Sequence, residues 1–190
     1  MRGENRVMRF RRGFVLAVCL LCNAGMAVAQ AVATTTVILV RHAEKAAEPA
    51  NDPPLTAAGE ARAKMLLEAV RDAGVSAIIT TELLRTRATA QPTAAALGIT
   101  PEVVSARGAA HAQDVAAAVK KHAGATVLVV GHSNTIPNII AALGAKQPGA
   151  ICDPEYDGFY VVTLRGTAAA VVRSRYGEPS RLDATTCAMK

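Results

Sequence analysis

The sequence predicts an α/β fold of three layers, in which a mostly parallel central sheet is covered by helices on both faces. Apolar, β-branched segments alternate along the 190 residues with segments whose apolar residues recur at helical spacing. With 51% hydrophobic and 19% charged residues, the chain can bury a substantial core. The composition therefore excludes wholesale disorder and fits one compact domain.

The order of the expected elements follows from local patterns. Residues 35–40 form a β-branched apolar run, which is typical of a buried strand. Thr56 is expected to cap a helix that ends near Asp72, and the TVLVV run at residues 126–130 is the strongest strand signal. Further strands are expected over residues 77–80, 102–104, 159–164 and 168–176, the last two as a hairpin, and further helices over residues 84–97, 112–122 and 136–143.

The first 29 residues have the layout of a secretory signal peptide. Arginines in the first dozen positions precede an apolar run over residues 14–28, which ends in the small-residue triplet Ala27-Val28-Ala29. Cleavage after Ala29 would leave residues 30–190 as a periplasmic or secreted domain. The alternative is a retained membrane anchor, but Asn23 and Gly25 interrupt the run, which is shorter than the ~20 apolar residues of a span. We expect no stable membrane anchoring after cleavage.

The net charge of +6 belongs mostly to this leader. Cleavage removes five of the 21 basic and one of the 15 acidic residues, which leaves a net charge of +2. No basic stripe interleaved with aromatic residues remains, so no nucleic-acid partner is expected. Of the four cysteines, only Cys152 and Cys187 remain, and the oxidising compartment predicts a disulfide between them.

Polar residues follow three of the predicted strands. Arg41 and His42 come directly after the first strand, Glu82 and Arg85 follow the second, and His132 follows the TVLVV strand. The carboxyl ends of parallel strands meet at one edge of a sheet, so these side chains should converge there. Guanidinium groups bind phosphate oxygens and a neutral imidazole is a nucleophile, so the cluster suits a phosphate group. The two histidines lack the close spacing of a metal motif, and no metal or cofactor is expected.

Four segments of the sequence resemble those of a known family. They are VILVRHAEK at residues 37–45, PLTAAGEARA at 54–63, TTELLRTRATA at 80–90 and VLVVGHSNTI at 127–136. In this order they resemble the histidine phosphatase superfamily, the phosphoglycerate mutase-like clan. The resemblance covers about residues 35–164 and implies a phosphoglycerate mutase-like fold. It also implies a phosphatase that acts on small phosphorylated substrates without a metal.

The resemblance implies a role for each polar residue. His42 would be the nucleophile that becomes phosphorylated, Arg41 and Arg85 would hold the phosphoryl oxygens, and His132 would donate hydrogen bonds to the phosphoryl group. No clear match exists for the carboxylate with which the family protonates the leaving group. Glu82 is the candidate, and that role requires a raised pKa; a structural acid at a helix start is the competing interpretation.

Export favours a phosphatase that hydrolyses phosphate monoesters through a phosphohistidine intermediate. The first alternative is a phosphohistidine protein phosphatase, because its substrate has a good leaving group and needs little acid assistance. The second is a non-catalytic phosphate-binding module. The sequence leaves the physiological substrate and the oligomeric state open.

Overall fold

The computed structural model describes residues 33–181 and residue 187. The chain divides into two units, Met1–Ala31 and Val32–Lys190, and all the described residues belong to the second. The expected signal peptide, residues 1–29, lies outside them. Among the described helices, none is both long enough and apolar enough to cross a membrane.

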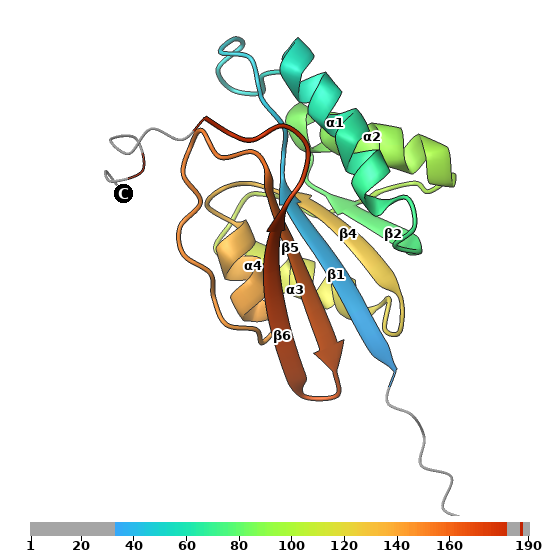
Figure 1. Ribbon diagram of the computed structural model, residues 1–190. Coiled ribbons are helices and arrows are strands. Elements are labelled where there is room, and N and C mark those ends of the chain that lie inside the picture. Colours follow the sequence, from blue (N-terminus) through green and yellow to red (C-terminus); the bar gives the residue numbers. More distant parts are fainter. Residues whose placement is uncertain (1–32, 182–186, 188–190) are drawn as a thin grey trace, which may run out of the picture. The chain divides into compact units, whose positions relative to one another are not determined.

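A six-stranded sheet forms the centre of the domain (Figure 1). Its strands are β1 (Thr34–Arg41), β2 (Val75–Thr80), β3 (Glu102–Val103), β4 (Thr126–Gly131), β5 (Gly158–Arg165) and β6 (Ala168–Arg175). They lie in the order β3-β2-β4-β1-β5-β6. The first four strands along the chain pair in parallel, whereas β5 pairs antiparallel with both β1 and β6. The sheet is therefore mixed, with a parallel part and the expected hairpin at one edge.

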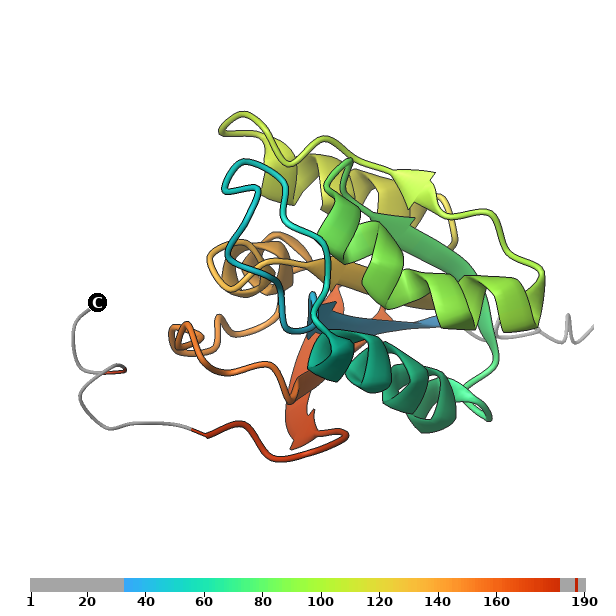
Figure 2. The ribbon, with the colours of Figure 1, turned by 90° about the horizontal axis from the view of Figure 1, so that it is seen from above.

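Helices cover both faces of the sheet, as predicted. They are α1 (Ala57–Val70), α2 (Leu84–Leu97), α3 (His111–Lys120) and α4 (Ile136–Ala142). The core residues of α1 and α2 pack on one face and those of α3 and α4 on the other. Figure 2 shows the segment after β1 and the long loop before β5 at the same end of the sheet.

The apolar run of β1, residues 37–40, is buried on both faces of the sheet. Val37 and Leu39 belong to the core cluster under α3 and α4, whereas Ile38 and Val40 belong to the cluster under α1 and α2. Successive side chains of a strand point to opposite faces, so a strand buried on both faces needs an apolar residue at every position. This burial fixes the position of the residues that follow β1.

Helix α1 is fastened to the segment after β1. The Thr56 hydroxyl caps the helix by accepting a hydrogen bond from the Gly59 N–H at 3.2 Å, and the Thr56 N–H donates to the Glu44 carbonyl at 2.9 Å. The buried Arg62 guanidinium donates Nε–H to both Glu44 carboxylate oxygens, at 2.9 and 3.0 Å. The ion pair with Arg62 therefore holds Glu44, and with it the segment after β1, against α1.

Gly59→Ala is expected to lower the free energy of unfolding by about 1–3 kcal/mol, because overpacking of this size forces backbone shifts. A Cβ at Gly59 would clash with the Glu44 carbonyl oxygen, which is backbone and cannot rotate away. Urea denaturation measures the effect. Gly149→Ala is the matched control, since a Cβ there meets nothing within 4 Å. Equal stability of the two variants would contradict the close approach of α1 to Glu44.

A disulfide joins Cys152, in the loop before β5, to Cys187 across 35 positions of sequence, with their Cα atoms 5.2 Å apart. Closing a loop of this length is expected to contribute about 3–4 kcal/mol in the chain-entropy model. Peptide mapping without reduction should therefore recover the two cysteines in one linked species, and reduction should lower the denaturation midpoint of wild type but not of Cys152→Ala. Recovery of both as free thiols in the native protein would contradict the pairing.

Candidate active site

The carboxyl ends of β1 and β4 bring the two histidines together. Arg41 lies opposite Gly131 in the parallel register of the strands, and the His42 N–H donates to the Gly131 carbonyl at 2.9 Å. As a result the ring centroids of His42 and His132 are 5.4 Å apart, in an edge-to-face arrangement. The convergence expected from the strand exits is thus present in the structure.

His42 is held as a neutral imidazole with one free lone pair. Its ring is buried, and Nδ1–H donates to the Ala43 carbonyl at 2.8 Å. Burial lowers the pKa of His42 to about 3. The hydrogen bond to Ala43 acts in the opposite direction, and the positive charges of Arg41 and Arg85 lower the pKa further. A neutral imidazole carries one N–H, so the lone pair resides on Nε2. His42 can therefore act as a nucleophile at neutral pH.

A chain of hydroxyl groups orients His132. Thr86 Oγ1–H donates to the Leu83 carbonyl at 2.9 Å, so Thr81 Oγ1–H is the donor to Thr86, at 2.8 Å. The Thr81 oxygen then accepts from His132 Nε2–H at 3.3 Å. Burial lowers the pKa of His132 to about 4, with a further contribution from Arg85, so this ring is also neutral. His132 consequently carries its proton on Nε2, and in the structure this N–H is directed to Thr81.

Arg41 points toward the loop before β5. Its Nη1 donates to the carbonyl oxygens of Cys152 and Glu155, at 3.1 Å each, and also to that of Asp153. Its Nη2 pairs with the Asp153 carboxylate at 3.1 Å, and the guanidinium lies 4.2 Å from the centre of the Tyr156 ring. The positive charge of Arg41 acts on His42 and His132, whereas its Nη1 and Nη2 groups bind the loop and its Nε is buried without a hydrogen-bond partner among the described residues.

Arg85 is the second guanidinium of the cluster and is bound more loosely. Its Nη1 lies 3.7 Å from the Asp52 carboxylate, and its Nε is buried without a hydrogen-bond partner among the described residues. Burial lowers the pKa of Arg85. Thr89 fixes the helix that carries Arg85 to the segment after β1, because Thr89 Oγ1 donates to the Arg85 carbonyl at 2.7 Å and accepts from the Ala43 N–H at 2.9 Å.

Glu82 lies within charge interaction of Arg85 and His132, but its pKa is not raised. Its Oε2 accepts a hydrogen bond from the Ala106 N–H at 2.8 Å, and Oε1 lies 3.6 Å from Arg107 Nε. The bond from Ala106 outweighs the effect of burial and lowers the pKa of Glu82. The expectation of a raised pKa is therefore wrong for this structure, since a backbone N–H stabilises the ionised carboxylate.

Tyr156 and Thr81 belong to the site although the sequence did not single them out. Tyr156 packs against Arg41, and its ring centroid is 6.1 Å from that of His42. Its only sequence signal is its place in the Cys152 loop, far from the motifs. Thr81 lies inside the TTELLRTRATA segment, where the sequence singled out Glu82 and Arg85. Nothing in that segment indicated the contact of Thr81 with His132. Within the described residues, no group of three or more His, Cys, Asp or Glu side chains is arranged as a metal site.

The His42 ring is expected to stay neutral between pH 8 and pH 5. Burial disfavours the charged form, so falling pH protonates this ring only near its lowered pKa of about 3. Nitrogen-15 NMR of the imidazoles measures this, and the Nδ1–H tautomer should persist across the range. The partly exposed His122 serves as the internal reference. Titration of His42 with a midpoint near 6.5, the ordinary value, would contradict the burial of the ring.

Comparison with known proteins finds one matching protein family and several similar solved structures. Residues 37–107 match the family model of the histidine phosphatase superfamily (branch 1), a range that includes His42, Glu82 and Arg85. No curated protein matches the chain. A putative phosphohistidine phosphatase SixA from Nakamurella multipartitia is 25% identical, with a TM-score of 0.54 over 78% of this chain and 98% of that one.

Two further solved structures share the fold at lower identity. A mutant phosphoserine phosphatase from Entamoeba histolytica, in complex with phosphoserine, is 15% identical with a TM-score of 0.56 and covers 75% of this chain and 96% of its own. A mycobacterial glucosyl-3-phosphoglycerate phosphatase is 16% identical with a TM-score of 0.55 and covers 75% and 98%.

Proposed function

The chain belongs to the histidine phosphatase superfamily, and from this premise we propose that it hydrolyses phosphate monoesters through an intermediate phosphorylated on His42. The observation that carries the proposal is the state of His42. A buried, neutral imidazole whose Nδ1–H is held by the Ala43 carbonyl directs its reactivity to Nε2, beside His132 and two guanidinium groups.

The reaction has two steps. In the first, the Nε2 lone pair of His42 forms a bond to phosphorus while the bond from phosphorus to the leaving oxygen breaks. In the second, water attacks phosphorus while the bond from phosphorus to Nε2 breaks, the proton of the water passes to the Glu82 carboxylate, and inorganic phosphate leaves with the neutral imidazole restored. Arg85 and His132, whose Nε2–H turns from Thr81 to a phosphoryl oxygen, stabilise the phosphoryl charge, and positioning of this kind supplies most of the catalysis in phosphoryl transfer. Arg41 contributes its positive charge, while its Nη1 donates hydrogen bonds to the loop before β5.

Glu82 is the proposed proton donor for a poor leaving group. The hydrogen bond from Ala106 lowers the pKa of Glu82, but a bound phosphate brings about two negative charges to the guanidinium and imidazole with which Glu82 interacts. Like charges raise the pKa of a carboxyl group, so substrate binding itself favours protonation of Glu82. The proton then passes to the leaving oxygen as the phosphorus–oxygen bond breaks.

Turnover of p-nitrophenyl phosphate by the purified protein tests the proposal. Saturable release of nitrophenolate, inhibited by inorganic phosphate or vanadate, is the expected result. Binding of phosphate without any turnover would overturn the proposal and would identify a phosphate-binding module.

We also propose that residues 1–29 direct export. The support is the basic region, the apolar run and the Ala27-Val28-Ala29 triplet. N-terminal sequencing of protein recovered from the cell envelope and medium should give Gln30 as the first residue. A chain that retains Met1 in the membrane fraction would show an anchor instead.

A phosphohistidine protein phosphatase is a second candidate. It is favoured by the neighbour that is a putative phosphohistidine phosphatase, 98% of which this chain covers. A phosphorylated histidine-containing carrier protein, assayed beside small phosphate esters, separates the two. A higher kcat/KM for the carrier protein would favour the second candidate.

A further inference from the structure

We infer that the groove between α3 and α4 holds the leaving group of the substrate, and that it selects an uncharged, hydroxyl-bearing group such as a sugar over a charged one. The inference rests on the proposed phosphatase function and names its substrate class. Two residues of the groove, Asn134 and Thr135, follow His132 in the chain, and none of the groove residues takes part in the chemical steps.

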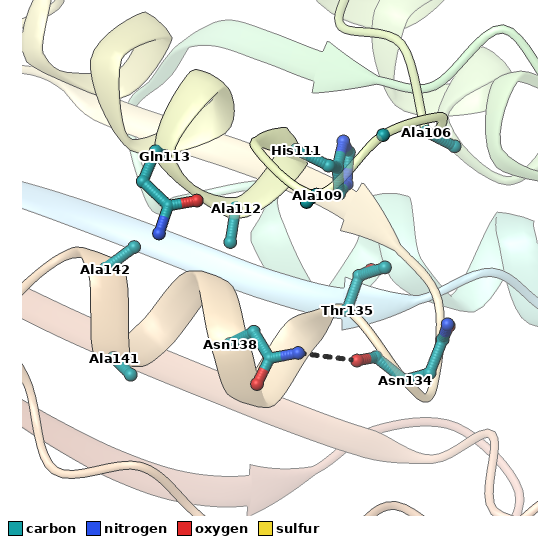
Figure 3. A pocket seen from close by; sticks show the side chains of 11 residues that line it. Ala106, Ala109, His111, Ala112, Gln113, Asn134, Thr135, Asn138, Ala141 and Ala142 are labelled. Atoms are coloured by element: carbon teal, nitrogen blue, oxygen red, sulfur yellow. Dashed lines mark hydrogen bonds between the residues drawn. The ribbon is translucent and has the colours of Figure 1, made fainter.

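The groove has the size of a small-molecule site. Its volume is about 600 Å³, and it is bounded by α3, α4 and the residues that precede α3. Figure 3 shows Gln113 and Ala112 on the α3 wall of the groove and Asn138 and Ala142 on the α4 wall. The small alanine side chains leave room that larger residues at the same positions would fill.

The groove begins where the candidate active site ends. Asn134 and Thr135, which line it, belong to the turn that carries His132, and the Thr135 hydroxyl accepts the His132 N–H at 3.1 Å. On the other side it is lined by Ala106, whose N–H binds Glu82. A substrate whose phosphoryl group lies at His42 and His132 would therefore extend its leaving group past Glu82 into this space.

The lining contains polar groups but no formal charge. None of the residues around the groove is an aspartate, glutamate, lysine or arginine. The Asn138 amide is fixed on both sides, since its nitrogen donates to the Asn134 carbonyl at 3.2 Å and its oxygen accepts from Gln147 at 3.0 Å. Amides and hydroxyls can pair with sugar hydroxyls as donors and as acceptors. A carboxylate or ammonium on the substrate would find no countercharge among these lining residues.

His111 adds a second observation that points to a ligand. It is the first residue of α3, 5% exposed, and its Nδ1–H donates to the Ser105 carbonyl at 2.7 Å. Its other ring nitrogen, Nε2, is buried and has no hydrogen-bond partner among the described residues. Buried acceptors are rarely left unpaired in folded proteins. A hydroxyl group at this wall of the groove would supply the missing donor.

The test compares phosphate esters that differ in charge but not in leaving-group chemistry. Glucose 6-phosphate, phosphoserine and 3-phosphoglycerate are all esters of a primary alcohol, so differences in kcat/KM report the groove. We expect glucose 6-phosphate to exceed both charged substrates at least tenfold. Ala141→Phe, which fills the groove from an exposed position, should lower kcat/KM for glucose 6-phosphate at least tenfold relative to that for p-nitrophenyl phosphate.

Two further variants control the test. Ala117→Phe changes an exposed alanine of α3 that does not line the groove and should leave the ratio of kcat/KM values unchanged. Gln113→Lys places a positive charge in the groove and should raise kcat/KM for 3-phosphoglycerate several-fold. Turnover of p-nitrophenyl phosphate with no preference among the three esters, or an unchanged ratio in Ala141→Phe, would overturn the inference alone. Absence of turnover with every substrate would overturn the proposed function, and the inference with it.

Discussion

His42→Ala is expected to lower turnover of p-nitrophenyl phosphate at least about a thousandfold, as the loss of a nucleophile does in other enzymes. The substitution removes the nitrogen that attacks phosphorus. His132 is not arranged to replace it, because its Nε2 carries a proton directed to Thr81. Steady-state kinetics with a nitrophenolate leaving group measures the loss, since this group departs without acid assistance.

The matched control for that variant is His122→Ala. His122 is partly exposed, pairs with Glu102 at 3.6 Å, and lies after α3, away from the strand exits. Its substitution should change turnover less than twofold, and both variants should unfold as cooperatively as wild type. If His42→Ala kept more than a tenth of the activity, the nucleophile would have to lie elsewhere, and His132 would be the first residue to test.

Glu82→Gln is expected to separate alkyl from aryl substrates. General acid assistance is worth about 10²–10⁴-fold when the leaving group is an alkoxide and little when it is nitrophenolate. We therefore expect kcat for glucose 6-phosphate to fall by about that factor, with at most a small loss for p-nitrophenyl phosphate. Because the acid must be protonated, the wild-type rate on glucose 6-phosphate should fall as the pH rises through the pKa of Glu82 in the complex, and the variant should lose this limb.

The design of the Glu82 variant isolates the proton. A glutamine side chain keeps an oxygen that can accept the hydrogen bond from the Ala106 N–H, so the loop before α3 retains its anchor. Glu102→Gln is the control, since Glu102 is a surface glutamate whose pKa is also lowered, in that case by Lys121. Equal losses on both substrates would show that Glu82 acts by positioning the loop rather than by donating a proton.

Local patterns predicted the fold well because the sheet is simple. The apolar β1 run, the Thr56 cap and the TVLVV strand each depend on a few neighbouring residues, and the structure confirms all three elements. The rule that parallel strands end at one edge was enough to place His42 beside His132. The hairpin of β5 and β6 was also predicted, although its antiparallel pairing with β1 required the structure.

The contacts that set the site depend on residues far apart in the sequence. Arg41 is bound by carbonyl oxygens of residues 152, 153 and 155, and no local pattern marks a carbonyl as an acceptor for a distant guanidinium. The lowered pKa of Glu82 depends on one backbone N–H, that of Ala106, across 24 positions of sequence. Composition and spacing identify residue types at the site but not which backbone groups occupy their hydrogen bonds.

Trapping of the phosphorylated enzyme tests the central claim most directly. The protein is mixed with phosphorus-32-labelled substrate, quenched in alkali within milliseconds, digested, and mapped for phosphate that is stable to base and labile to acid. The account predicts label on the peptide that contains His42, at up to one phosphate per chain, in wild type and in Glu82→Gln but not in His42→Ala. Continued turnover with no labelled histidine, or with the label on another residue, would contradict it.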